Sequence, residues 1–491
     1  MRVLTGLAGA VLLVVLPTAA AAQECNLSSG QLNQVGTGTP QEMIFIGGGV
    51  TFTCPDGKVI KSDSAVIVKA TEQRFLIGHA YYADAEKALS ADRINYFARE
   101  KHLNAQLAVV LNDRVNGATI QGDYLDYYMA NGPQTPSRTY VYGGRPHAVL
   151  RARPAADGAP PADTTSTLVD ADRMEIQGQN SFHAMGNVAL IRGPMKGAAS
   201  EIEYAPSDNR VRLTGNARIE GENYTLNGGT LDGTLAGNTF KDVTATYQAQ
   251  LQSQDLTVKG STVAIAFRDG QVERLVALSP DRAKRTATDG AGLAEATSKE
   301  FKLVADSIDA LAPLQKLEKV VAVGKAYGER ENDSIKVKLP EIVSKDWLRG
   351  DTIVATFAAA KPRAAKANGK ANGKANGAAK AVPQRAPADT AERVLERIVA
   401  SGGAVPASSA YRIIDEKQPG GVPAVNYILA KRIGVAFRDG DVHEVQAEGQ
   451  IRGIHLEPTP PPAKPKTDEK AKPTSNSVAR SPAAAQGSRK P

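Results

Sequence analysis

The sequence of 491 residues contains few of the residues from which catalytic and metal sites are usually built. Its six histidines lie far apart, with no HExxH or similar ligand spacing, so a metal site is not expected. Walker loops, GxSxG motifs and strand-to-helix GxGxxG motifs are absent, which argues against nucleotide hydrolases, α/β-hydrolases and dinucleotide-dependent enzymes. The sequence therefore predicts a protein with no cofactor and no enzymatic activity.

Aromatic side chains make up only 5% of the sequence, and Trp347 is the single tryptophan. A carbohydrate-active β-solenoid would usually show aromatic sugar platforms or clustered carboxylates. Glu201 and Glu203 could provide a carboxylate pair for glycoside hydrolysis, but charged residues that alternate with apolar ones are typical of a solvated strand face. An extracytoplasmic β-solenoid that acts on carbohydrate, or adheres to it, is kept as the alternative function.

Long apolar runs are confined to the first 22 residues, which have the layout of a secretory signal peptide. Arg2 gives a basic start, residues 11–16 form an apolar core, and cleavage is expected after Ala22. An uncleaved membrane anchor is the alternative, because residues 3–22 are nearly long enough to span a bilayer. No later stretch approaches 18 apolar residues, so the mature protein is predicted to be soluble outside the cytoplasm.

Cysteine is equally scarce, since Cys25 and Cys54 are the only two. In an oxidising compartment such a pair is most simply a disulfide, which would close a loop of about 30 residues and stabilise the fold by roughly 3 kcal/mol. Free or metal-binding thiols are the alternative, although no histidine is near enough in sequence to suggest a metal site.

The formal net charge of +7 is concentrated in two low-complexity segments. Residues 361–393 contain eight Lys/Arg and two Asp/Glu, which gives +6, and residues 457–491 contain seven and three, which gives +4. The remainder is therefore close to −3, which argues against nucleic acid as a partner. The two basic segments are interpreted as solvated spacers, with binding to an acidic partner or a membrane surface as the alternative.

Composition also divides the chain into consecutive sections. The predicted organisation is a signal peptide at 1–22, an N-terminal β section at 23–152, a linker at 153–166, a central β section at 167–280, a C-terminal β section at 281–456 with a disordered insert at 359–391, and a disordered Pro/Lys/Ala-rich tail at 457–491. The insert contains the tetrapeptide KANG three times and cannot bury a core.

One phrase is repeated: residues 263–279 read VAIAFRDGQVERLVALS, and residues 434–449 read GVAFRDGDVHEVQAEG. Each copy has alternating apolar residues, an Arg-Asp-Gly turn and a second alternating segment, which is typical of a β-hairpin. Weaker copies occupy residues 306–324 and 351–402, the latter with the insert at its turn. The repeat is interpreted as one hairpin of a repetitive sheet.

This repeat also changes the interpretation of residues 392–400, ERVLERIVA. The segment alone has the apolar spacing of an amphipathic helix. Because the corresponding copies are second strands of tight hairpins, a strand with a bulge after Leu395 is predicted instead. Helical segments are otherwise nearly absent, and glycines recur between short alternating strands at Gly186, Gly197, Gly215 and Gly228. The predicted fold class is all-β, with repeated short antiparallel hairpins.

Four segments share this pattern of glycine and alternation: GNVALIRG at 186–193, ASEIEYAPSDNRVRLTGNARI at 199–219, ADSIDALAPLQKLEKVVAVGKAYGE at 305–329 and IGVAFRDGDVHEVQAEGQIRG at 433–453. In them the chain resembles the OstA-like family, which includes the periplasmic lipopolysaccharide-transport protein LptA and the N-terminal domain of LptD. The resemblance covers most of residues 40–357 and 392–456. It implies an open, elongated, twisted β-jelly roll, here expected in two or three consecutive sections.

The resemblance also implies a function, because members of the family carry lipopolysaccharide between membranes with its acyl chains in a V-shaped groove. It implies a location in the periplasm, with an association with the outer membrane left open. The expected partners are lipopolysaccharide or a related amphipathic glycolipid, and other OstA-like jelly-roll proteins joined end to end through open edge strands. Six apolar residues with one facing parity are the candidates for the groove lining, and a closed core is the alternative for each. They are Val188, Leu190, Ile202, Tyr204, Val211 and Leu213.

Overall fold

The structure is a computed structural model of the whole chain. It describes residues 25–115, 117–132, 134–151, 165–178, 181–205, 207–236, 239–253, 256–280, 292–298, 301–313, 316–330, 345–359, 393–413, 423–438 and 441–457. The predicted signal peptide lies outside the described residues, as do most of the predicted linker, all of the insert but Ala359, and all of the tail but Glu457.

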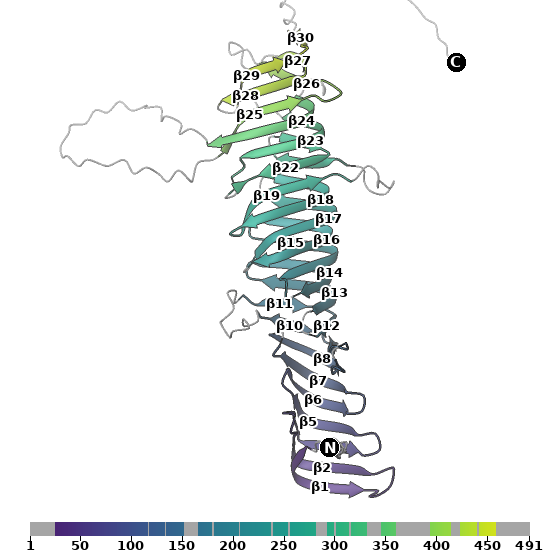
Figure 1. Cartoon of the computed structure of the whole chain (residues 1–491). Helices are drawn as coiled ribbons and strands as arrows, with labels where there is room; N and C mark the ends of the chain where they lie inside the picture. Colours follow the sequence, from purple (N-terminus) through teal and green to yellow (C-terminus); the bar gives the residue numbers. More distant parts are fainter. Residues whose placement is uncertain are drawn as a thin grey trace, which may run out of the picture.

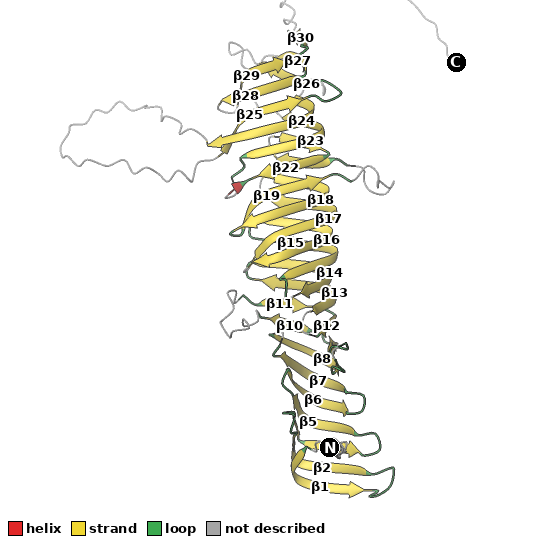
Figure 2. Cartoon of the chain, in the orientation of Figure 1, coloured by secondary structure: helices red, strands yellow, loops and turns green. Residues whose placement is uncertain are grey.

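The described residues form one antiparallel sheet, which confirms the predicted all-β class (Figure 2). They contain no α-helix, apart from a helical turn at Pro313, and accordingly no helix able to cross a membrane. The strands stack along one axis from β1 at one end to β30 at the other (Figure 1), as expected for an elongated, open β-jelly roll.

Fourteen of the 30 described strands are long and bend in the middle, where the pairing register shifts. The two halves of each bent strand belong to two facing walls, and the bends together form a corner that runs along the molecule. The bent strands are β1 (Asn26–Val35), β2 (Met43–Thr53), β5 (Gln73–Ala83), β6 (Lys87–Phe97), β7 (His102–Asp113), β8 (Ala118–Tyr128), β13 (Ser181–Arg192), β14 (Met195–Ala205), β15 (Arg210–Glu220), β16 (Tyr224–Ala236), β17 (Thr239–Ser253), β18 (Leu256–Arg268), β23 (Lys319–Arg330) and β24 (Asp346–Ala359).

The remaining strands each lie in one wall. The first wall contains β4 (Ser64–Val68), β9 (Arg138–Tyr142), β12 (Arg173–Gln177), β19 (Gln271–Leu278), β22 (Ser307–Leu311), β25 (Arg393–Ser401), β28 (Arg432–Arg438) and β29 (Asp441–Glu448). The second wall contains β3 (Val59–Ser62), β10 (His147–Leu150), β11 (Thr167–Asp170), β20 (Ala294–Ser298), β21 (Phe301–Ala305), β26 (Ala407–Ile413), β27 (Ala424–Ala430) and β30 (Arg452–Leu456).

A short strand of the first wall and one of the second together take the place of one bent strand. If each bent strand and each such pair counts as one rung, the described sheet has 22 rungs. Neighbouring strands are about 4.8 Å apart, and the trough between the walls is therefore roughly 100 Å long. Hydrogen bonding continues across the predicted linker, because β8 pairs with both β9 and β10, which pair in turn with β12 and β11.

The corner has a clear backbone cause: alternate bent strands carry two consecutive residues with positive φ. The pairs are Gly48 with Gly49, Gly78 with His79, Leu107 with Ala108, Gly186 with Asn187, Gly215 with Asn216, Tyr247 with Gln248 and Gly324 with Lys325. Five of the seven begin with glycine, which adopts this conformation without a steric penalty. The extra residues bend each strand as a β-bulge does, and the bends are in line because each wall keeps its own register.

The hairpins predicted from the repeated phrase are present. In β18–β19, Arg268 is opposite Gln271, as a two-residue turn requires, and Glu273 is an extra, bulged residue. The segment with helical periodicity is strand β25, and its bulged residue is Glu396, which confirms the strand and the bulge after Leu395. In β28–β29 the bulged residue is His443.

Candidate functional site

The six apolar residues expected to share one face all point into the space between the walls. Five are buried, with exposed fractions from 1% for Ile202 and Leu213 to 7% for Leu190. Tyr204 is half-buried and packs against the same core. The two walls are in contact here, since a Cβ added at Gly197 would lie 3.4 Å from Cδ2 of Leu213 in the opposite wall.

The interior of the trough is filled with side chains in this structure. Its apolar residues form one continuous cluster from Ile46 to Val435. A crevice between the walls, with room for about one water molecule, includes three of the six candidates, Leu190, Val211 and Leu213. The other residues that line it are Thr167, Arg192, Met195, Ile219, Leu235 and Phe240. Acyl chains could therefore enter only if the walls move apart.

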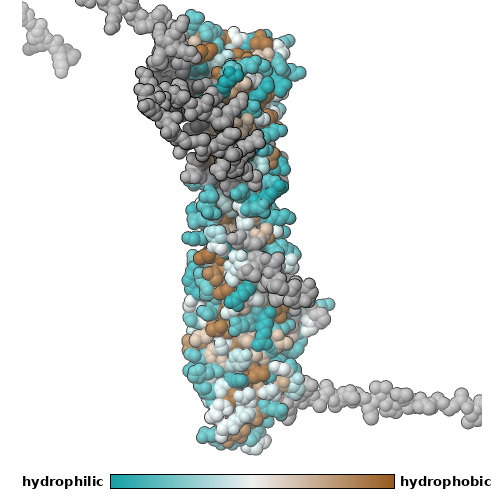
Figure 3. All heavy atoms as spheres, turned by 90° about the vertical axis from the view of Figure 1, so that its left-hand side faces the viewer, coloured by the Kyte–Doolittle hydropathy of each residue, from teal (hydrophilic) through white to brown (hydrophobic). Residues whose placement is uncertain are grey.

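The outer surface of the same strands is polar. Glu201 and Glu203 point away from the core, and Nε2 of His183 lies 2.5 Å from Oε1 of Glu201. Asp232 accepts hydrogen bonds from Arg210 and Arg212, and its pKa is lowered, mainly by the bond from Arg210. Figure 3 shows hydrophobic residues scattered among hydrophilic ones over the described part of the face that it draws. The central strands thus have an apolar inner face and a polar outer face.

In the part of the chain that the structure describes, backbone pairing joins the two walls only through the corner. On the side opposite the corner each wall ends in a row of hairpin turns, here called the first rim and the second rim, and the gap between the rims is called the seam. Within the described residues, every strand pairing and every additional backbone hydrogen bond stays within one wall or follows a strand round the corner. Separating the rims would therefore break side-chain contacts and no strand ladder.

Side-chain contacts nevertheless close the seam at intervals, several of them between a cation and an aromatic ring. Each of the following contacts joins one rim to the other. Arg74 lies over Phe52 at 5.5 Å, Lys87 over Tyr127 at 5.5 Å and Arg330 over Phe437 at 5.9 Å, and the rings of Tyr224 and Phe267 are 5.5 Å apart. Contacts of this kind contribute about 0.5–2 kcal/mol each, much less than a row of strand hydrogen bonds.

The two rims differ in chemistry. The inward positions next to the first rim include eight aromatic residues, Tyr96, Tyr127, Phe182, Tyr204, Phe240, Phe267, Phe357 and Phe437. Those next to the second rim include five charged residues, Lys58, Lys87, Asp113, Arg192 and Arg330. Aromatic residues lie next to the second rim as well, among them Phe52 and Tyr224, and Arg74 lies next to the first rim. The two rims therefore differ in the balance of aromatic and charged side chains rather than in kind.

Among the described residues of the second rim, the most buried charged pair is Lys87 with Asp113. Nζ of Lys87 donates to Oδ2 of Asp113 at 2.5 Å, and the side chains are 3% and 0% exposed. Burial raises the pKa of the neighbouring Tyr82 and Tyr127 well above the usual value. It also raises the pKa of Tyr224 to about 12.

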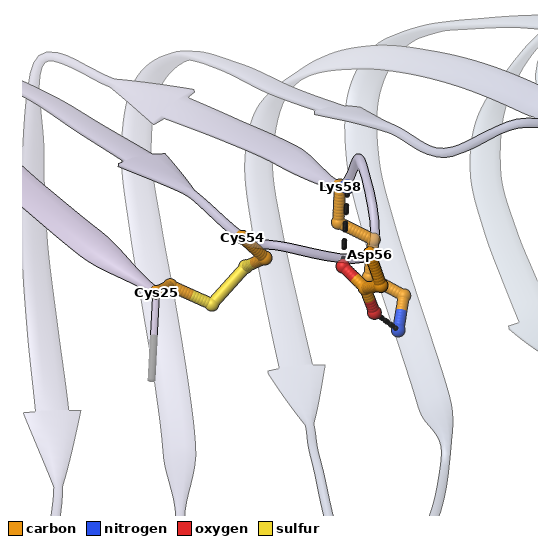
Figure 4. The surroundings of a disulfide bond; sticks show 4 residues. All are labelled: Cys25, Cys54, Asp56 and Lys58. Atoms are coloured by element: carbon orange, nitrogen blue, oxygen red, sulfur yellow. Dashed lines mark hydrogen bonds and ion pairs between the residues drawn. A yellow bond between two sulfur atoms is a disulfide. The ribbon is translucent and has the colours of Figure 1, made fainter. Parts of the chain in front are cut away.

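The N-terminal end of the trough is tied by a disulfide between Cys25 and Cys54, with a Cα–Cα distance of 4.0 Å (Figure 4). The bond joins the start of β1 to the end of β2 at the second rim. Lys58 and Asp56 form an ion pair in the next turn, at 2.6 Å. The described residues contain no cluster of three or more His, Cys, Asp or Glu side chains that could hold a metal ion.

The sequence indicated the inward face but missed the seam and the charged residues beside it. A signal was present for Arg192, because it continues the two-residue spacing of Val188 and Leu190. That spacing predicts an inward arginine at the end of an apolar strand face. The seam itself has no local signal, since it depends on where the strands bend.

Comparison with known proteins finds a family model and solved structures that are similar to this chain. Residues 162–234 match the family described as LptA/(LptD N-terminal domain) LPS transport protein. Among solved structures, the chain is similar to LptH, the LptA homologous periplasmic component of the conserved lipopolysaccharide transport device from Pseudomonas aeruginosa. The identity is 9% and the TM-score 0.18, over 32% of this chain and 82% of that chain, values at which the match gives no information about function. A search of curated protein sequences finds no match.

Proposed function

We propose that this protein, which carries an OstA-like segment at residues 162–234, is a non-catalytic periplasmic carrier of lipopolysaccharide or a related glycolipid. The acyl chains of the cargo would lie between the two walls, and its sugars would lie outside the seam. The observation that supports the proposal is the seam, because among the described residues a continuous apolar interior is closed along one side by side-chain contacts and by no backbone pairing.

The free energy of acyl-chain burial is large enough to replace the side-chain contacts that close the seam. Each buried CH₂ group of an acyl chain contributes about 0.8 kcal/mol, so one chain of a dozen carbons outweighs several seam contacts. The interior side chains would lose contacts with one another and gain contacts with the acyl chains, which are equally apolar. The walls can separate because the corner, where the strands bend, is the hinge that joins them.

The ends of the sheet support the expected pairing with other jelly-roll proteins. All ten residues of β1 are exposed, and β30 is exposed along its whole length at the opposite end. Unpaired edge strands are templates for strand addition. A partner of the same fold could therefore extend the trough from either end, and the acyl chains would then pass from one trough to the next.

Photocrosslinking in cells tests the proposal. A photoreactive residue at Leu213, which points inward, is expected to capture lipopolysaccharide or a similar glycolipid, and mass spectrometry identifies what is captured. The matched control is Arg212, the next residue of the same strand, which points outward. Equal capture at both positions, or none at Leu213 in a folded protein, would show that acyl chains do not lie between the walls.

A further inference from the structure

We propose that the outer face of the second wall, at the C-terminal end of the sheet, docks on an anionic lipid bilayer. The proposal goes beyond the carrier function and does not depend on it. The surface is called here the terminal apolar face, and it comprises outward residues of β24, β27 and β30, toward the top of the molecule in Figure 1. Its members are Trp347, Val425, Tyr427, Leu429, Ile454 and Leu456.

The strand register shows that these side chains point away from the trough. Ile428 packs against the core, so its neighbours in β27, Tyr427 and Leu429, point outward. In β30, Ile454 is directly opposite Tyr427 and shares its face. The ring of Trp347, the single tryptophan of the chain, lies 6.0 Å from the ring of Tyr427. The members of the terminal apolar face are therefore neighbours on one surface.

This face is apolar, whereas the outer face of the central strands is polar. Ile454 and Leu456 are 58% and 54% exposed. Asn426 and His455 share the inward direction of Ile428 and form a hydrogen bond with each other. In β27 and β30 the usual order of an apolar inner face and a polar outer face is thus partly reversed. Exposed apolar residues that gather on one face mark a surface for a partner or a membrane.

Positive charge accompanies the terminal apolar face. Arg349 and Arg452 are exposed on it, and in the part of the chain that the structure describes neither forms an ion pair. Glu329, which shares the face, is paired with Lys345 at 2.8 Å. The sequence that follows β30 directly, residues 457–491, adds seven Lys/Arg and three Asp/Glu, a net charge of +4.

An anionic bilayer is the occupant that this combination fits. Trp and Tyr rings favour the level of the lipid headgroups, aliphatic side chains reach the acyl boundary, and Lys and Arg attract anionic lipids. An apolar contact together with a basic segment provides the two signals that stable peripheral binding requires. A twofold contact between two copies of the chain would instead bring the same arginines and basic segments together, and like charges repel.

Vesicle flotation tests the docking with the chain from residue 23, which keeps every described residue and lacks the apolar segment 3–22. Phosphatidylcholine vesicles with about a quarter of phosphatidylglycerol should bind the protein at least about tenfold more tightly than vesicles of phosphatidylcholine alone. Ile454→Ser with Leu456→Ser should weaken binding to the anionic vesicles at least about tenfold. The matched control is Leu27→Ser with Leu32→Ser, exposed apolar residues of β1 at the opposite end of the sheet, which should leave binding unchanged.

A chain that ends at Glu457 separates the two contributions, because it keeps the terminal apolar face and lacks the basic segment. It should lose the preference for anionic vesicles. Unchanged binding by the I454S/L456S variant would overturn the proposal and leave a basic segment that adheres to anionic lipid by itself. Dissociation of a dimer by that variant, without an effect on vesicle binding, would make the face a contact between copies.

The same variants distinguish this proposal from the carrier function. Ile454 and Leu456 lie outside the trough, so I454S/L456S should bind lipopolysaccharide as the unchanged protein does. A loss of vesicle binding with unchanged lipopolysaccharide binding supports the docking face, and failure of the carrier alone would leave vesicle binding intact. If the double variant loses its thermal transition, Ile454→Thr, which keeps a β-branched side chain, decides between the same outcomes.

Discussion

At the scale of single residues, the fold depends on a few backbone positions at the corner. Gly215 has a φ of +80°, and a Cβ at this residue would lie 2.6 Å from Oγ of Ser200. Leu107 and Ala108 have positive φ without being glycine, so they adopt a conformation that costs about 1 kcal/mol or more. The glycine repeat was visible in the sequence, but the corner was not, because such non-glycine pairs carry no signal.

Two substitutions at the corner are expected to have opposite effects. Gly215→Ala should destabilise the protein by about 1–2 kcal/mol, from the positive φ and the clash with Ser200. Ala108→Gly should stabilise it by about 0.5 kcal/mol, because relief of strain exceeds the added entropy of the unfolded chain. Midpoints of denaturant unfolding measure both changes. A loss of stability in both variants would contradict the role assigned to the corner.

At the scale of elements, the hairpin is the unit that the sequence predicts best. The Arg-Asp-Gly turn of β18–β19 and the register that follows it agree with the repeated phrase. Residues 392–400 show why comparison within the chain mattered, since local periodicity favoured a helix and the copies favoured a strand. The segment is a strand because it pairs with β24 along its length. This pairing is a tertiary contact, which the local periodicity of the sequence does not include.

The insert between β24 and β25 is expected to be dispensable for folding. Ala359 is directly opposite Arg393, the same relation that Arg268 and Gln271 have across a two-residue turn. Replacing residues 360–392 with Asp-Gly should therefore join the strands without strain and leave the thermal midpoint within a few degrees. A matched variant with Pro-Pro at the same place should lower the midpoint, because proline cannot adopt the positive φ of this turn. Loss of cooperative unfolding in the Asp-Gly variant would contradict the pairing of β24 with β25.

At the scale of the whole molecule, the family resemblance and the all-β class were predictable, and the resemblance is confirmed for residues 162–234. The alternation of apolar and polar residues predicts which side chains share a face, because the two-residue period is a property of each strand alone. It could not tell that the long strands bend at a corner, that the walls meet at a seam, or that Arg192 lies beside a crevice. Those features arise when 22 rungs are stacked and their bends line up.

The central claim is that the seam opens to admit acyl chains, and cross-linking the rims tests it directly. Cysteines at Tyr224 and Phe267, whose rings are 5.5 Å apart across the seam, would be joined by a short thiol cross-linker. The control pair is Thr225 and Gln252, neighbours within the second wall, where a cross-link leaves the seam free. The account predicts that lipopolysaccharide binding by the seam-linked protein falls at least about tenfold, which is 1.4 kcal/mol, while the control binds as before. Undiminished binding by the seam-linked protein would contradict it.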